Sequence, residues 1–157
     1  MTAGRHPRSA GVLVWRRVGE SIEVLLAHPG GPFFAKKDDG AWSIPKGEYS
    51  LDESPLEAAR RELEEETGLV ATGELAVLGE VRQKSGKVVT AFAWGSDFDP
   101  ARLRSNTFSL EWPPRSGKHI DVPEIDRVAW FSLVDAQLKM IEAQQPLLER
   151  LRTLLGF

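Results

Sequence analysis

The most constraining feature of this sequence is one helix whose two ends are marked by its own residues. Ser54 is suited to cap the N-terminus, Pro55 suits the first helical position, and Glu57 completes a capping box with Ser54. Gly68 supplies the residue type that most often ends a helix. The segment between Ser54 and Gly68 is therefore predicted to be an α-helix.

The acidic side chains of this helix gather in one sector. At about 100° per residue, Leu56 and Leu63 fall on the same side, which we expect to face the core. Glu66 borders that side, and Glu62 and Glu65 lie next to it in the same direction around the helix. A purely solvated helix face would not place a glutamate at the apolar border, so these carboxylates are candidate ligands.

Clustered carboxylates need a compensating positive charge. Two of them about 6 Å apart repel by roughly 3 kcal/mol at an effective dielectric constant of about 20. The chain has no cysteine, and His6, His28 and His119 show no metal-ligand spacing, so the oxygen ligands favour magnesium or manganese over zinc. The alternative is an ordinary charged helix held by pairs such as Arg61 with Glu65.

The rest of the chain consists of short apolar runs separated by turn residues, without a repeat or a long linker, so 157 residues are expected to form one domain. The expected strands are residues 11–15, 22–27, 42–44, 77–82, 87–94 and 127–131. Ser132 and Pro146 each begin a further helix, the last with a leucine stripe. Residues 97–123 are expected to be irregular, because they are rich in proline, serine and arginine. This mixture predicts an α/β or α+β layered fold.

Composition excludes several classes of function. Without cysteine the chain has no disulfide scaffold, thiolate metal site or cysteine nucleophile. No apolar run reaches the roughly 18 to 20 residues of a membrane span, and residues 1–10 lack a secretory pattern, so a cytoplasmic protein without a membrane partner is expected. The net charge is −3, but residues 52–66 carry seven acids against two bases and the remainder of the chain is mildly basic. That pattern suits a divalent cation with an anionic ligand better than a nucleic-acid surface.

The segment from Gly47 to Leu69 reads GEYSLDESPLEAARRELEEETGL. It resembles the Nudix box, G-x5-E-x7-R-E-U-x-E-E-x-G-U, where U is an apolar residue. Every fixed position is matched, by Gly47, Glu53, Arg61, Glu62, Leu63, Glu65, Glu66, Gly68 and Leu69. The resemblance implies an α/β protein with a Nudix-type α/β/α sandwich around a central mixed β-sheet.

The same resemblance implies roles for individual residues. The implied metal ligands for Mg²⁺, or Mn²⁺, are Glu62, Glu65, Glu66 and the carbonyl of Gly47. Arg61 would orient a glutamate through a charge-assisted hydrogen bond, and Glu53 would be structural.

Proteins of this family also tend to recruit a carboxylate from outside the box. Glu124 is the candidate because it precedes the last expected strand, and Glu111 and Glu80 are weaker rivals. Either Glu65 or Glu124 would be the catalytic base that takes a proton from the attacking water, and the residues leave this choice open.

The implied activity is metal-assisted attack of water on phosphorus in a nucleoside diphosphate linked to another moiety, such as a nucleoside triphosphate or dinucleoside polyphosphate. Candidate substrate-binding residues are Lys46, Arg115 and Lys118, with weaker candidates Lys36, Lys37, Lys84, Lys87, Phe34 and Trp42. Markers of ADP-ribose and dinucleoside polyphosphate hydrolases are absent downstream of the box, so the substrate stays open. The alternative function is a non-catalytic Nudix-fold nucleotide sensor or interaction module.

Overall fold

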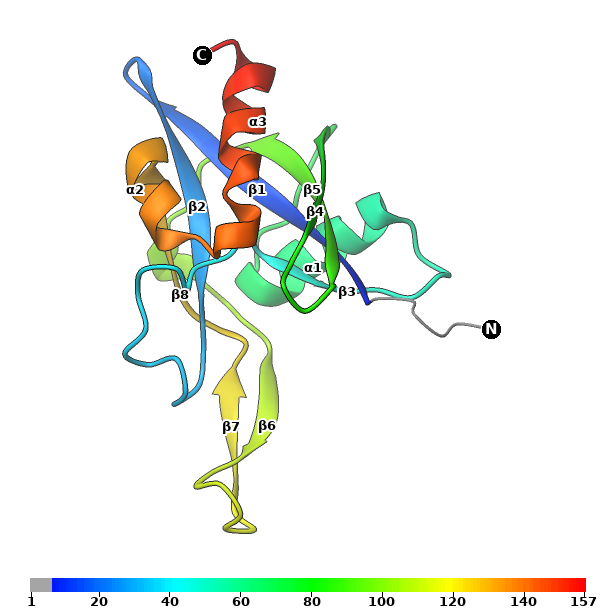
Figure 1. Cartoon of the computed structure of the whole chain (residues 1–157), viewed down its shortest axis with the longest axis vertical. Helices are drawn as coiled ribbons and strands as arrows, with labels where there is room; N and C mark the ends of the chain where they lie inside the picture. The colour runs from blue at the N-terminus through cyan, green and yellow to red at the C-terminus, as the bar shows by residue number, and fades with distance from the viewer. Residues whose placement is uncertain (1–6) are drawn as a thin grey trace.

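A computed structural model describes residues 7–157, which are built around one mixed β-sheet (Figure 1). The strands of this sheet are β1 (Arg8–Val18), β2 (Ser21–Pro29), β3 (Lys46–Glu48), β4 (Ala76–Arg82), β5 (Val88–Gly95) and β8 (Ile125–Ser132). They are hydrogen-bonded in the order β4-β5-β1-β2-β8, and β3 pairs with the first residues of β1. The β1–β5 pair is parallel and the others are antiparallel, so the sheet is mixed as expected.

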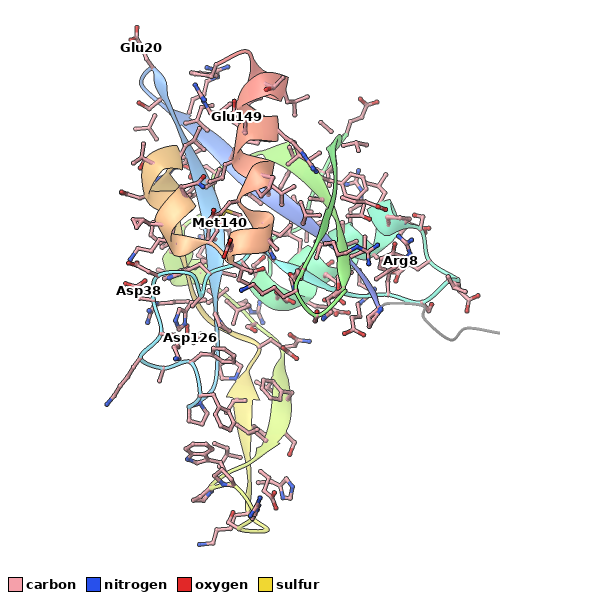
Figure 2. All side chains as sticks on the ribbon, in the orientation of Figure 1. Arg8, Glu20, Asp38, Asp126, Met140 and Glu149 are labelled. Atoms are coloured by element: carbon pink, nitrogen blue, oxygen red, sulfur yellow. The ribbon has the colours of Figure 1, made fainter. Side chains whose placement is uncertain are left out.

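Helices cover both faces of the sheet (Figure 1). The helical elements are α1 (Pro55–Thr67), η1 (Pro100–Arg102), α2 (Leu133–Lys139), η2 (Glu142–Gln144) and α3 (Pro146–Leu155). Successive side chains of β1 point to opposite faces. Val12 packs in a buried cluster with Leu63 of α1, whereas Leu13 packs in a second cluster with Met140 and with Leu151 of α3. Met140 lies between α2 and α3 (Figure 2). The α/β/α sandwich is thereby confirmed.

Helix α1 begins and ends where its sequence predicts. The Ser54 hydroxyl accepts a hydrogen bond from the Glu57 backbone N–H, and the Glu57 carboxylate accepts one from the Ser54 backbone N–H. Gly68 takes a left-handed conformation with φ of 84° and ends the helix. This reciprocal capping fixes where the box glutamates project.

The buried face of α1 differs from the expected one. Leu56, which the sequence places on the core face, is 37% exposed. Ala58, Glu62 and Thr67 are buried instead, together with Leu63. The helix packs on β1 and β3, and the small residues facing those strands permit a close approach. The buried face is therefore rotated toward Glu62 and Glu66.

The predicted strand at residues 42–44 is wrong. Trp42 and Ser43 form only isolated bridges, to Met140 and Ala27 respectively. The regular strand begins after Pro45, as β3, which pairs Lys46 with Gly11 of β1. The apolar residues before it pack into the core, which is why they resemble a strand in sequence.

The sequence predicts that residues 97–123 are irregular, but part of this segment is regular. They contain η1 and a β-hairpin formed by β6 (Thr107–Glu111) and β7 (His119–Pro123). This hairpin is a separate two-stranded sheet that projects from the body of the molecule (Figure 1). Half-buried residues alternate with exposed ones along β6, a period-2 pattern that the prolines and charged residues of the turn obscured.

The two C-terminal helices are confirmed. Ser132 caps α2 through its hydroxyl, and Pro146 begins α3. Leu147 and Leu148 are buried as the leucine stripe predicts, whereas Leu154 is exposed near the end of α3. Among residues 7–157, no helix combines the length and the apolarity needed to cross a membrane.

Candidate active site

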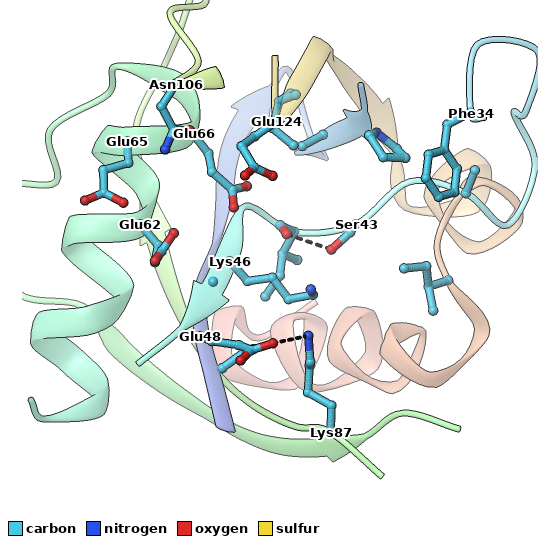
Figure 3. A pocket seen from close by; sticks show the side chains of 18 of the residues that line it. Phe34, Ser43, Lys46, Glu48, Glu62, Glu65, Glu66, Lys87, Asn106 and Glu124 are labelled. Carbon is cyan, nitrogen blue, oxygen red and sulfur yellow. Dashed lines mark hydrogen bonds and ion pairs between the residues drawn. The ribbon is translucent and has the colours of Figure 1, made fainter. Parts of the chain in front are cut away.

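A pocket of about 590 Å³ opens between β3, the C-terminal half of α1 and the base of the β6–β7 hairpin (Figure 3). Its lining brings together six of the residues singled out from the sequence, namely Lys46, Gly47, Glu62, Glu65, Glu66 and Glu124. Five of them lie on α1 and β3, and Glu124 is the residue that joins β7 to β8. The sheet and helix thus converge on one carboxylate-rich cavity.

Gly47 is required by the close approach of Glu62. A Cβ atom at Gly47 would overlap the Glu62 carboxylate, so any side chain there would displace that group. Gly47 pairs with Ala10 in the β1–β3 ladder, which holds its backbone rigidly against the helix. The glycine therefore lets a buried carboxylate lie against the β3 backbone.

Arg61 organises the acidic residues from the solvent side. Its Nε and Nη2 atoms donate to the two carboxylate oxygens of Glu53 at 2.8 and 2.9 Å. Its Nη1 atom donates to Glu62 at 2.8 Å and to Glu65 at 3.2 Å. The hydrogen bond from Arg61 lowers the pKa of Glu53. Arg61 thus holds the side chains of two box glutamates, and Glu53 in turn holds Arg61.

Burial makes Glu66 the most perturbed acid of the pocket. Loss of solvation raises the pKa of Glu66 to about 8, and the neighbouring Glu62 carboxylate contributes to the rise. The Lys46 ammonium and a hydrogen bond from the Lys46 backbone act in the opposite direction. Burial also raises the pKa of Glu62, while its hydrogen bond with Arg61 lowers it. Burial therefore favours the protonated form of Glu66, and a positive charge entering the pocket would favour its ionised form.

Glu124 is held in the pocket by a backbone strap. Asn106 donates its backbone N–H to the carbonyl of Glu65 at 2.9 Å, and its own carbonyl accepts the N–H of Glu124 at 2.9 Å. The Ser105 hydroxyl accepts the N–H of Ile125 at 3.0 Å. This link places the carboxylate of Glu124 opposite the α1 glutamates (Figure 3). No local pattern in the sequence predicts it.

The two rival carboxylates are located elsewhere. Glu80 on β4 pairs with Arg8 at 3.2 Å, and Glu111 on β6 accepts hydrogen bonds from the turn of its own hairpin. Neither residue lines the pocket. Glu124 is therefore the one of the three that the fold brings to the box glutamates.

The candidate substrate-binding residues separate into two groups. Lys46 lines the pocket, and so does Lys87, which ion-pairs with Glu48 at 3.0 Å. Arg115 and Lys118 lie in the turn of the β6–β7 hairpin and are not part of the pocket lining. Their expected placement near the phosphates is therefore corrected, because the hairpin extends away from the sheet (Figure 1). The other weak candidates among the lysines, Lys36, Lys37 and Lys84, do not line the pocket either.

Aromatic residues near the pocket have distinct environments. Trp42 is buried and donates its indole N–H to Asp38 at 2.9 Å, so it belongs to the core. Phe34 is exposed and lines the pocket, where it remains available for stacking. The loop that carries both residues is tied to α2 by an ion pair between Lys139 and Asp38 at 2.7 Å. Figure 2 shows Asp38 in that loop.

The histidines do not form a ligand set. His28 is fully buried, with its Nδ1 atom 2.9 Å from an Asp126 carboxylate oxygen and its Nε2 atom 2.6 Å from the Lys37 carbonyl. His119 is exposed on β7, and His6 lies outside the described residues. His28 is a structural link between β2, β8 and the following loop.

Several residues of the pocket lining are not marked by any motif in the sequence, and two of them are polar residues next to the box. Ser9 on β1 and Asn106 before β6 both line the cavity, and both are ordinary residue types in unremarkable contexts. Pairing of β1 with β3 brings Ser9 to the box, and the backbone hydrogen bond to Glu65 brings Asn106 there. In the geometry described for residues 7–157, no three acidic or histidine side chains converge closely enough to hold one metal ion. Glu62 and Glu65 are directed to Arg61 instead.

Known proteins provide independent information on this chain. Residues 5–151 match the family model of the NUDIX domain. An RNA pyrophosphohydrolase of Stenotrophomonas maltophilia is 47% identical over 49 residues, which cover 30% of this chain and 23% of that protein. An octanoyltransferase of Myxococcus xanthus is 29% identical over 129 residues, which cover 82% of this chain and 32% of that protein. The aligned segments thus span about a quarter to a third of these relatives.

Solved structures share the whole fold at low sequence identity. A C. elegans Ap4A hydrolase binary complex superposes with a TM-score of 0.64 at 22% identity, covering 96% of this chain and 99% of that one. The NUDIX domain of Shewanella oneidensis NrtR, complexed with ADP ribose, gives 0.65 at 19% identity and covers 96% and 88%. The MutT protein from Methanosarcina mazei gives 0.62 at 21% identity and covers 97% and 96%. These matches establish the sandwich.

Proposed function

This chain belongs to the Nudix family, and on that premise we propose that it is a metal-dependent hydrolase of a diphosphate bond. The substrate is a nucleoside diphosphate linked to another moiety. A small nucleotide is favoured over a long nucleic acid because the chain carries a net charge of −3.

The observation that carries this proposal is the meeting of Glu124 with Glu62, Glu65 and Glu66 in one pocket. Glu124 lies between β7 and β8, far along the chain from α1, and its backbone N–H donates to the Asn106 carbonyl. A helix whose acids served only solubility would not need a fourth carboxylate brought to it from outside. Two of these acids, Glu62 and Glu66, have a pKa raised by burial, and buried acids with a raised pKa in a cavity are typical of functional sites.

The donor set fits Mg²⁺ or Mn²⁺, because it consists of carboxylate oxygens and the Gly47 carbonyl. Glu62, Glu65 and Glu66 would hold the cation once Glu62 and Glu65 turn from Arg61. A bound divalent cation would neutralise the diphosphate and lower the pKa of water. A positive charge here would also relieve the burial cost that holds Glu66 in its protonated form.

The residues of the chain have separable roles in the reaction. Arg61 orients Glu62 and Glu65 through its donated hydrogen bonds. A carboxylate oxygen of Glu65 or Glu124 accepts the proton of the water whose oxygen attacks phosphorus, and the P–O bond to the leaving phosphate breaks. Lys46, on the β3 side of the same pocket, binds a phosphate oxygen.

A compound screen tests the proposal. The protein is incubated with nucleoside di- and triphosphates, dinucleoside polyphosphates, nucleotide sugars and a 5′-triphosphorylated oligonucleotide, with magnesium, manganese or EDTA, and products are identified by mass. We expect cleavage with either metal and none in EDTA. A Glu65→Gln variant should be strongly impaired, whereas Glu64→Gln, exposed on the same helix, should not. Absence of turnover on the whole panel would refute the proposal.

One observation favours the alternative of a non-catalytic nucleotide sensor or interaction module. Arg61 already pairs with Glu62 and Glu65, which compensates part of the acidic charge without a metal. A sensor would bind a nucleotide from the panel in calorimetry without releasing any product. The same screen therefore separates the two functions.

A further inference from the structure

Ser9 has an unusual position at the base of the pocket. Its side chain is fully buried, and its hydroxyl is the one buried side-chain polar atom, among those of residues 7–157, without a hydrogen-bond partner. Buried polar groups are nearly always satisfied, and an unpaired hydroxyl costs free energy. Because Ser9 lines the pocket, a ligand in that pocket is the natural partner for this hydroxyl.

The strand register places two lysines on the same face as Ser9. The Cα atom of Ser9 is paired with Glu48 on β3 and with Val89 on β5. Side chains two residues apart in a strand share a face. Lys46 precedes Glu48 by two residues and Lys87 precedes Val89 by two, so both extend toward the side occupied by Ser9. All of these polar residues line the pocket.

Gly11 provides the space for this arrangement. Gly11 pairs with Lys46, and a Cβ atom at Gly11 would come within 2.6 Å of the Lys46 Cβ. The absence of a side chain therefore lets the Lys46 stem lie against β1. In Figure 3 Lys46 and Lys87 point toward one another from β3 and from the start of β5.

The two ammonium groups are incompletely neutralised. Lys46 is half-buried and lies beside Lys87, so each ammonium has a neighbour of like charge. Glu48 pairs with Lys87 at 3.0 Å, but the Glu48 side chain is 61% exposed and can leave toward solvent. Two neighbouring cations beside an unpaired hydroxyl therefore form a site suited to an anion with several acceptor oxygens.

We propose that Ser9, Lys46 and Lys87 form an anion subsite that binds a phosphoryl group of the substrate. Accepting the diphosphate hydrolase function proposed above, this phosphoryl group lies beyond the diphosphate held at the glutamates. Alternation along β3 puts Gly47 and the carboxylates on one side of the strand and the two lysines on the other. The substrate then contains at least three consecutive phosphoryl groups, and this phosphate chain extends from one side of β3 to the other.

Calorimetry with inorganic tripolyphosphate, in EDTA and at low salt, tests the subsite without catalysis. Lys87→Met should weaken binding by about tenfold, the effect of losing one charge-assisted hydrogen bond. Ser9→Ala should also weaken it, by about threefold or more. Glu48→Gln should strengthen it, because a competing carboxylate is removed. Lys84→Met is the matched control, since Lys84 is exposed in the turn before β5 and does not line the pocket.

Circular dichroism and thermal unfolding verify that each variant is folded. Ser9→Ala deletes one unpaired oxygen and should unfold at the parent's temperature or above it. If Lys87→Met and Ser9→Ala bind tripolyphosphate as tightly as Lys84→Met does, the subsite proposal is wrong. Lysine-dependent binding in a protein that hydrolyses nothing would instead support the subsite and refute the hydrolase.

Substrate length provides a second measurement. Ser9→Ala should raise KM for compounds with three or more consecutive phosphoryl groups and leave KM for nucleotide sugars, which have two, unchanged. An equal rise for both classes would contradict the assignment of a third phosphoryl position.

Discussion

Replacing Glu66 by glutamine tests whether the ionised Glu66 carboxylate, next to the other acids of α1, destabilises the metal-free protein. Glutamine has nearly the same shape and can still accept the hydrogen bond from the Lys46 backbone. It cannot ionise, so it removes the negative charge that Glu66 acquires next to Glu62 as the pH rises. Without metal the variant should be more stable than the parent at neutral and alkaline pH.

The size and pH range of this effect follow from the pKa of Glu66. Burial raises that pKa from 4.5 to about 8. Between pH 4.5 and about 8, the folded protein therefore binds one more proton than the unfolded protein does. Its free energy of unfolding is largest below pH 4.5 and falls as the pH rises through about 8. At about 1.4 kcal/mol per pKa unit the fall is at most about 5 kcal/mol. Partial hydration and coupling to Glu62 reduce our expectation to about 1–3 kcal/mol.

Urea unfolding in EDTA, followed by tryptophan fluorescence at about pH 5 and about pH 9, measures this fall. The parent should lose stability between the two conditions, and Glu66→Gln should lose less. Glu64→Gln is the control, because Glu64 is exposed on the same helix. Magnesium should stabilise the parent more than Glu66→Gln, and the variant should lose most turnover.

Equal pH dependence in the parent and Glu66→Gln would refute the reasoning about burial. Near-normal turnover with magnesium would remove Glu66 from the metal site. These two results are independent, since the first concerns the metal-free fold and the second the loaded pocket.

Three further substitutions test other contacts of the pocket. Glu124→Gln should slow hydrolysis without abolishing magnesium binding in calorimetry, and an unchanged rate with an unchanged pH-rate profile would exclude Glu124 as the fourth carboxylate. Gly47→Ala should lower kcat by about tenfold or more, or about 1.4 kcal/mol of barrier, because its Cβ displaces the Glu62 carboxylate; normal kinetics would show that this contact is dispensable. Arg61→Lys loses the paired hydrogen bonds to Glu53, so urea unfolding should show a loss of about 1 kcal/mol, and unchanged stability would contradict that role.

Local patterns in the sequence were sufficient to predict the elements whose ends are chemically marked. Helix α1 is the best example, because Ser54, Glu57 and Gly68 specify its ends through short-range hydrogen bonds and backbone conformation. The box glutamates follow from it, since helical spacing fixes their direction. The error at Leu56 arose because hydrophobicity was given more weight than the small residues that allow close packing on β1 and β3.

Features that depend on distant pairing could not be derived in this way. Nothing near Ser9 in the sequence indicates that β3 and β5 flank it, and Asn106 reaches Glu65 only through the fold. The β6–β7 hairpin was missed because its turn residues dominate the composition of the segment. Arg115 and Lys118 were candidates because a sandwich fold could turn their segment toward the metal, and nothing local in the sequence shows that this segment is a projecting hairpin.

The β6–β7 hairpin is closed at its base, where Glu124 hydrogen-bonds to Asn106 and Thr107 pairs with Pro123. The tip of the hairpin lies beyond this closure and beyond Trp112, which packs against Phe33, so a change at the tip should leave the carboxylate after the closure in place. The exposed turn at Ser116 and Gly117 is consequently a tolerant attachment point, where a reporter peptide could be inserted to follow the molecule while its chemistry continues undisturbed.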